Sequence, residues 1–275
     1  MREFDFYIVP TPIGNLGDIT NRAIEILKEV DIIACEDSRN TQKLLNHFSI
    51  GTKCISYHKF NEHERVAKFI ELIKEGKKIA LVSDAGTPLV CDPGSILIRE
   101  LKKENISVTA LPGANAAVTF ISQIPRETEE FCFAGFLPKS VSQIKELLNS
   151  HNNFDTVFYE SPNRLLETLK IISEEFPNRT VSVGRELTKV FEEVLTDTVE
   201  NLLTHFSQKE IKGEIVLLVH KTNKHASLIS LDNKIKKLKN KKYSDKDISI
   251  ILSTLFDVNK NEVYSYILKK NGIVK

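Results

Sequence analysis

Short apolar runs alternate with helical patterns through the first 120 residues of the chain. The strand-like runs are Phe6–Val9, Ile32–Cys35, Cys54–Ser56, Ile79–Val82 and Ser107–Leu111. Apolar residues recur at helical spacing at about residues 23–30, 62–75 and 95–103. This alternation predicts an α/β domain with a mostly parallel sheet and helices on its faces.

The pattern changes after about residue 120. Further strand-like runs are Phe131–Ala134, Thr156–Tyr159, Thr180–Val183 and Glu214–Val219, and helical patterns cover Ile144–Leu148, Leu165–Ile172 and Glu200–Phe206. The run Phe191–Val199 has β-branched residues and weak alternation, which indicates an extended edge or hairpin element. We therefore expect a boundary near Phe120–Pro125, an N-terminal α/β domain over residues 1–120, and a second α/β domain with a mixed sheet over residues 121–221.

The last segment, residues 222–275, has the pattern of a small helical domain. The polar stretch Thr222–Leu228 is typical of a linker, and Ile235 and Leu238 mark a short lysine-rich helix. Two capping pairs open further helices: Ser244 with Asp247, and Asn259 with Glu262. The tight turn between them, at residues 257–259, predicts a helix-turn-helix-like pair.

The net charge of the chain also changes sign near residue 221. From Lys221 to Lys275 there are thirteen lysines, no arginine and five acids, a balance of +8. The whole chain carries +1, so the first 220 residues carry −7. One interpretation is structural: a helical hairpin that only covers the two α/β domains would also have lysines on its solvent-exposed face. The size of the imbalance favours a module that binds a polyanion such as RNA.

Other features narrow the class of protein. The longest apolar runs, such as Ile215–Val219, are too short to span a bilayer, and acids replace the basic stretch of a signal peptide after Met1, so we expect a cytoplasmic protein. The four cysteines are scattered and should be mostly buried free thiols. His58 and His63 do not share a helix face, and no metal site is expected.

Four loops that follow predicted strands hold small residues and prolines. They are residues 10–18 (PTPIGNLGD), residues 83–88 (SDAGTP) with the DPG at 92–94, residues 111–116 (LPGANA) and residues 135–138 (GFLP). Open α/β sheets bind their ligands at the carboxyl ends of strands, and several such loops favour a ligand site. There is no G-x-G and no Walker motif, so spacing alone indicates only a nucleotide-like ligand.

The loops belong to a longer series of motifs with a family resemblance. VPTPIGNLGDIT, EDSRNT, SDAGTPLVCDPG, LPGANA, GFLP, YESPNR, GRELTKVFEE and GEIVLLV follow one another over about residues 5–220. In order and spacing they resemble the tetrapyrrole-methylase superfamily. They are most similar to its bacterial branch that methylates the ribose 2′-oxygen of a cytidine in the decoding region of 16S rRNA. The resemblance implies S-adenosylmethionine as donor, a cleft between two α/β domains, and a homodimer; no contact with a membrane is expected, since the apolar runs are short.

The resemblance also implies the site residues. Those matching the donor-binding pattern are Pro12, Asp84, Gly86, Thr87, Ala114, Asn115, Leu137, Tyr159 and Gly213. A ribose hydroxyl is a poor nucleophile at neutral pH, so a base or an orienting group is expected. The candidates are the charged motif residues Glu36, Asp37, Arg39, Arg185, Glu186, Lys189, Glu192 and Glu193. A lysine–carboxylate pair could hold the lysine neutral or orient the hydroxyl. Arg39, Arg164 and Arg185 would suit RNA phosphates.

Two alternatives remain open at this point. Within the superfamily, a porphyrinoid C-methyltransferase, or an enzyme that methylates a modified histidine precursor on a translation factor, would need the same donor loops. Neither substrate calls for the basic segment at residues 222–275. A non-catalytic RNA-binding or ribosome-assembly protein would explain that segment but not the ligand-type loops.

Overall fold

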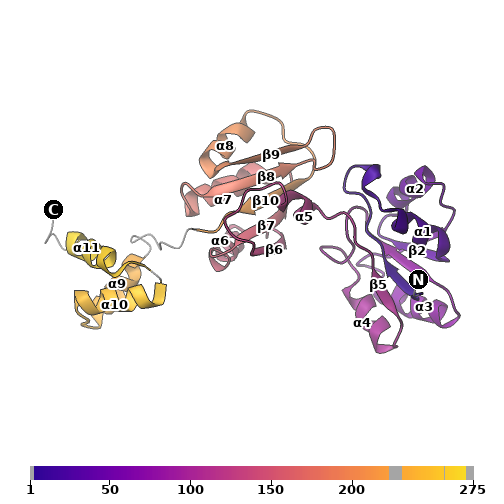
Figure 1. Ribbon diagram of the computed structural model, residues 1–275, viewed down its shortest axis with the longest axis horizontal. Helices are drawn as coiled ribbons and strands as arrows, with labels where there is room; N and C mark the ends of the chain where they lie inside the picture. The colour runs from indigo at the N-terminus through magenta and orange to yellow at the C-terminus, as the bar shows by residue number, and fades with distance from the viewer. Residues whose placement is uncertain (1–2, 223–230, 257, 271–275) are drawn as a thin grey trace.

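The N-terminal part of the protein is built on one parallel sheet. The computed structural model describes residues 3–222, 231–256 and 258–270 (Figure 1). The first five strands are β1 (Phe6–Ile8), β2 (Ile32–Cys35), β3 (Lys53–Ser56), β4 (Ile79–Val82) and β5 (Val108–Ala110). They pair in parallel in the order β3-β2-β4-β1-β5. The predicted parallel sheet is confirmed, and all its carboxyl ends meet at one edge.

Helices cover both faces of this sheet. They are α1 (Asn21–Glu29), α2 (Ser38–His47), α3 (Glu62–Lys74) and α4 (Ser95–Lys103), with a short 3-10 helix, η1 (Leu16–Asp18), before α1. Side chains of a strand point alternately to the two faces. On β2, Ile33 therefore packs with α1 and α2, whereas Ile32 packs with α3 and α4. Both faces are buried, which explains why these strands are apolar throughout.

The second part is a mixed sheet. Its strands are β6 (Phe131–Phe136), β7 (Asp155–Glu160), β8 (Thr180–Arg185), β9 (Glu193–Thr198) and β10 (Ile215–Val219), in the order β6-β7-β10-β8-β9. Only the pair of β6 and β7 is parallel. The run at residues 191–199 was predicted as an edge or hairpin element, and β9 is the antiparallel edge strand beside β8.

Four helices pack on the mixed sheet. They are α5 (Ala116–Ile121), α6 (Val141–Ser150), α7 (Leu165–Glu175) and α8 (Val199–Ser207). The last three share a core with Phe158 and Leu217 on one face. On the other face Phe120 of α5 packs with Val216 of β10, and Ile13 from the loop after β1 joins the same cluster. This cluster therefore ties the first loop of the chain to the second sheet.

Residues 231–256 and 258–270, the described part of the C-terminal segment, form three helices, as predicted. They are α9 (Asp232–Asn240), α10 (Asp245–Phe256) and α11 (Lys260–Lys270), and they have an apolar core of their own that includes Ile235, Leu252 and Ile267. Both predicted capping pairs are present, because Ser244 Oγ accepts from Asp247 N at 3.1 Å and Asn259 Oδ1 accepts from Glu262 N at 3.4 Å. The predicted linker lies outside the described residues beyond Thr222.

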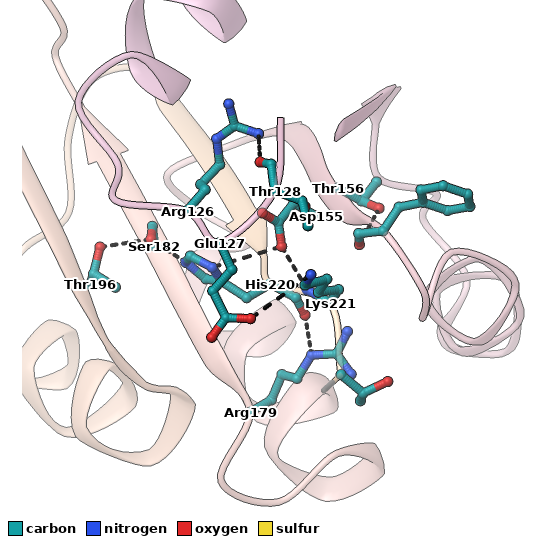
Figure 2. A network of polar contacts seen from close by, with 12 residues as sticks. Arg126, Glu127, Thr128, Asp155, Thr156, Arg179, Ser182, Thr196, His220 and Lys221 are labelled. Atoms are coloured by element: carbon teal, nitrogen blue, oxygen red, sulfur yellow. Dashed lines mark hydrogen bonds and ion pairs between the residues drawn. The ribbon is translucent and has the colours of Figure 1, made fainter. Parts of the chain in front are cut away.

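A polar network holds the end of β10, where the chain leaves the mixed sheet (Figure 2). His220 Nε2 lies 2.8 Å from Ser182 Oγ, and its Nδ1 lies 3.9 Å from Asp155 Oδ1. The Arg179 guanidinium donates to the His220 carbonyl oxygen, and Lys221 N donates to Asp155 Oδ1 at 2.8 Å. Burial lowers the pKa of His220. The network fixes the point from which the C-terminal segment departs.

Two expectations about the whole chain can be compared with the described residues. None of the helices there is long and apolar enough to cross a membrane. The four cysteines are free, but only Cys35 is fully buried and Cys91 is exposed, so the expectation of mostly buried thiols was wrong. Cys91 is among the residues that line a cavity.

Candidate functional site

A cavity of about 400 Å³ lies between the loops after β4 and β5 and the mixed sheet. The predicted donor residues that line it are Asp84, Gly86, Thr87, Asn115, Tyr159 and Gly213. Pro12 lines a neighbouring cavity, and Ala114 and Leu137 line neither. Leu137 is instead buried in the core of the mixed sheet, and its backbone N donates to the Tyr159 carbonyl at 3.2 Å. The volume is in the range of pockets for small ligands.

The loops on the first sheet are locked to one another. Thr11 and Gly86 exchange two backbone hydrogen bonds of 2.9 Å, and Gly86 adopts a left-handed φ of +80° that favours glycine. Thr87 Oγ1 donates to the Ala114 carbonyl at 2.9 Å. A Cβ on Gly113 would lie 2.5 Å from the ring of Pro10. The glycines and prolines read from the sequence therefore hold three strand ends in contact.

Aromatic rings form the wall that comes from the mixed sheet. The Tyr159 ring makes edge contacts with Phe133 and Phe136, with centroids 4.9 and 5.4 Å apart. Burial raises the pKa of Tyr159 to about 12, so the phenol is neutral. Phe136 is 63% exposed, and part of its ring faces the cavity. Sequence reasoning missed this residue, although it stands inside the GFLP motif.

Carboxylates gather on the first-sheet side of the cavity. Asp84 Oδ1 accepts from Asp37 N at 3.1 Å, and Asp84 Oδ2 accepts from Asn40 Nδ2 at 3.2 Å. Burial, with Asp92 and Asp84 nearby, raises the pKa of Glu36. Burial also raises the pKa of Asp92, which lines the cavity and was not predicted.

Asp37, the acid next to Glu36, has a lowered pKa instead. Arg39 pairs with Asp37 at 2.7 Å and holds the pKa of Asp37 at about 2, so Asp37 is a weak proton acceptor. Glu36 lines neither of the two cavities.

The GRELTKVFEE motif supplies a three-membered ion network. Lys189 Nζ lies 2.8 Å from Glu186 Oε1 and 2.9 Å from Glu214 Oε2. Burial alone would lower the pKa of Lys189, but the two carboxylates outweigh it and raise that pKa. A neutral lysine was one expectation, and it was wrong because Lys189 is a paired cation. Glu186 and Thr188 have left-handed φ values of +52° and +64°, which is strained backbone for residues with a Cβ.

The other charged residues of this motif have partners within the protein. Arg185 Nε donates to Glu193 Oε2 at 3.0 Å, and Lys209 Nζ lies 2.6 Å from Glu193 Oε1. Glu192 accepts from Thr188 N at 2.7 Å. Glu192 and Glu193 thus hold the β8–β9 loop and the edge of the sheet.

The three arginines expected for RNA phosphates fall into two groups. The Arg164 guanidinium donates to the carbonyls of Leu137 and Pro138 and pairs with Glu160 at 3.4 Å. Arg164 and Arg185 are therefore occupied inside the fold, which corrects the expectation for both. Arg39 also pairs with a carboxylate, Asp37, but its side chain is 88% exposed, and its contact with an RNA phosphate stays a prediction.

Comparison with known proteins places this architecture in a family. Residues 5–203 match the family of Tetrapyrrole (Corrin/Porphyrin) Methylases. Ribosomal RNA small subunit methyltransferase I of Buchnera aphidicola subsp. Acyrthosiphon pisum is 41% identical over 96% of both chains. The protein of the same name from Hydrogenobaculum sp. is 45% identical, and the match covers 79% of this chain but 96% of that one. That relative therefore lacks a counterpart to about a fifth of this chain.

Solved structures share the fold at low sequence identity. Diphthine synthase aligns with a TM-score of 0.64 at 15% identity, over 79% of this chain and 90% of its own. Uroporphyrin-III C-methyltransferase from Thermus thermophilus, complexed with S-adenosylhomocysteine, aligns with a TM-score of 0.55 at 15% identity, over 78% and 96%.

The family match and the named relatives identify the chain as a methyltransferase, and its fold is α/β. The chain belongs to the tetrapyrrole methylase family, in the branch of the ribosomal RNA small subunit methyltransferases I.

Proposed function

We propose that the protein transfers the methyl group of S-adenosylmethionine to the 2′-oxygen of a cytidine ribose in the decoding region of 16S rRNA. The full-length identity of 41% with a protein named for small-subunit ribosomal RNA supports the RNA substrate. The cavity that holds most of the predicted donor residues supports the donor. The juxtaposition of these residues in one cavity is the observation that carries the proposal.

The cavity has partners for each part of the donor. Its adenine would lie against the exposed Phe136 ring, since aromatic side chains offer large apolar contact area. Gly86 and Gly213 bring backbone close to the ligand. When bound, the donor would supply a methyl group on a positively charged sulfur.

Lys189, Glu186 and Arg39 have positioning roles in this proposal. The strained loop holds Lys189 as a cation between two carboxylates. The Lys189 side chain packs on Gly14 of the first loop, and a Cβ added to Gly14 would lie only 2.5 Å from Lys189 Cγ. This contact joins the first loop to the mixed sheet. Arg39 presents an exposed cation at the carboxylate side, where an RNA phosphate would find a partner.

The C-terminal helices have an accessory role. The Hydrogenobaculum relative lacks about a fifth of this chain, the size of residues 222–275, yet it has the same name. We therefore propose that the basic segment adds RNA affinity and that the methyl-transfer site lies wholly in residues 10–214. A structural cap is the competing role, and deletion distinguishes the two.

We also propose three domains and a homodimer. The N-terminal boundary at residue 120 falls inside α5, which packs on the mixed sheet, so the connection before Ala116 is a better division.

Val190 and Phe191 project from the strained loop with 93% and 72% of their surfaces exposed. Apolar side chains so exposed suit a partner subunit. Light scattering should give a dimer that Phe191→Asp weakens.

The acceptor class is the decisive question for the proposed function. Labelled methyl groups from S-adenosylmethionine should appear in 16S rRNA, either free or in the small subunit, and not in a uroporphyrinogen control. Asp84→Ala should abolish the transfer and Lys28→Ala, on the far end of α1, should leave it unchanged. Transfer to the porphyrinoid instead would overturn the proposal. Binding of RNA by a protein with no measurable donor affinity would favour the non-catalytic alternative.

A further inference from the structure

A smaller cavity, of about 180 Å³, adjoins the donor cavity. It lies between the loop after β1 and helix α2, and Pro12, Leu16, Asn40 and Lys43 are among its lining residues. Only two of its lining residues, Pro12 and Asp84, belong to the predicted donor site. It is smaller than the usual 300–1,000 Å³ or so of small-molecule pockets, and it has room for one nucleobase or one ribose only.

The two cavities share a single lining residue, Asp84. Its carboxylate is fixed from the side of α2, by Asp37 N at 3.1 Å and by Asn40 Nδ2 at 3.2 Å. Methyl transfer is an in-line displacement, so acceptor oxygen and donor methyl must meet within contact distance. Asp84 is in the wall that both cavities share, so an acceptor oxygen in one cavity and a donor methyl group in the other can come into contact beside it.

The chemistry of the smaller cavity suits a nucleoside. Pro12 and Leu16 offer apolar surface to a base, and Leu16 is 40% exposed at the opening. The Asn40 amide gives its NH₂ group to Asp84, which leaves its oxygen free to accept from an exocyclic amine such as that of cytosine. Arg39 and Lys43 are four residues apart on α2 and so lie on one face, where they suit the flanking phosphates.

We infer that this cavity binds the base of the nucleotide that accepts the methyl group, and that Asp84, on the wall shared by the two cavities, positions the ribose 2′-hydroxyl of that nucleotide. The inference rests on the proposed function. The ribose oxygen forms the new O–CH₃ bond as the CH₃–S bond breaks, and the bonding electron pair stays on sulfur as a neutral thioether. The hydroxyl proton passes to the Asp84 carboxylate and then to water.

The test separates the acceptor pocket from the donor site. Leu16→Trp closes the opening without changing charge, and Lys43→Glu places a repelling charge beside it. Lys28→Glu is the matched control, an exposed helical lysine at the opposite end of the sheet. We expect both pocket variants to raise KM for small subunits about tenfold or more, equivalent to about 1.4 kcal/mol. The dissociation constant for S-adenosylmethionine, measured by calorimetry, should change less than twofold or so.

Each outcome decides a different point. If the wild-type protein transfers no methyl group to RNA, the proposed function fails. If the wild type is active and both pocket variants keep the KM of Lys28→Glu, the acceptor pocket is refuted. If Leu16→Trp lowers the melting temperature, the exposed variant Lys43→Ala replaces it, and an unchanged KM in that variant also counts against the pocket.

Discussion

Gly213 is the position where one methyl group should disturb both stability and the donor cavity. Its φ is +92°, and a Cβ there would overlap the Glu186 carboxylate. That carboxylate accepts from Lys189 Nζ at 2.8 Å and from Glu214 N at 3.0 Å. Gly213→Ala should therefore displace Glu186 from both partners and push backbone at the cavity wall.

The size of the effect can be worked from these contacts. A left-handed φ costs a residue with a Cβ about 1–2 kcal/mol. Loss of a hydrogen bond to a charged group costs about 1.5–3 kcal/mol, and the two bonds of Glu186 are not additive. We expect a loss of about 3 kcal/mol, which corresponds to about 6–12 °C in melting temperature for a cooperative unit of roughly 150–250 residues, the size of the two sheets with their helices.

Gly135→Ala is the matched control. Gly135 lies in the same mixed sheet with a φ of +72°, and a Cβ there meets only Cys91 Sγ at an ordinary 3.6 Å. Gly135→Ala should lower the free energy of unfolding only by the cost of a left-handed φ for a residue with a Cβ, about 1–2 kcal/mol. Scanning calorimetry of the two variants isolates the overlap with Glu186. An equal loss of melting temperature in both variants would refute the packing described for Gly213.

Three further predictions follow from separate contacts. Phe136→Ala should weaken S-adenosylmethionine binding by about tenfold in calorimetry, through loss of aromatic contact, and an unchanged affinity would remove the ring from the site. Deletion of residues 224–275, or reversal to Glu of Lys236, Lys237, Lys241 and Lys242, should reduce the salt dependence of RNA binding with donor affinity unchanged; an unchanged salt slope with a lower melting temperature would favour the cap. The lowered pKa of His220 means that wild-type stability is lost as pH falls below about 6.5. Glutamine does not titrate, so the stability of His220→Gln lacks this dependence on pH. The difference in melting temperature between wild type and His220→Gln should therefore shrink from about pH 7.5 to 5.5. A constant difference would contradict the buried neutral imidazole.

Sequence periodicity was sufficient for most of the fold. Strands buried on both faces and amphipathic helices leave strong patterns, so both sheets and the edge strand β9 were predicted. Helix α2 was not, because only Thr41, Leu44 and Leu45 of its ten residues are buried and its polar face hides the period. It matters because α2 fixes Asp84 and lines the smaller cavity.

The candidate site was predictable at the level of loops and not of contacts. Strand-end loops meet in any parallel sheet, so most donor residues reach one cavity. Whether a charged side chain is free depends on partners distant in sequence, and Arg164 is tied to carbonyls 26 and 27 residues away. The cationic state of Lys189 likewise depends on Glu214, 25 residues further along the chain. Periodicity and spacing contain no signal for either.

The central claim is tested most directly by the chemical position of the transferred methyl group. Small subunits that lack the modification would be incubated with the protein and S-adenosylmethionine, and their 16S rRNA would be cleaved with alkali. A 2′-O-methyl group removes the hydroxyl that attacks the phosphodiester, so the proposal predicts one new gap in the ladder, at a cytidine of the decoding region. The Asp84→Ala protein should leave the ladder continuous. Incorporation of labelled methyl without any gap would place the methyl group on a base and contradict the account.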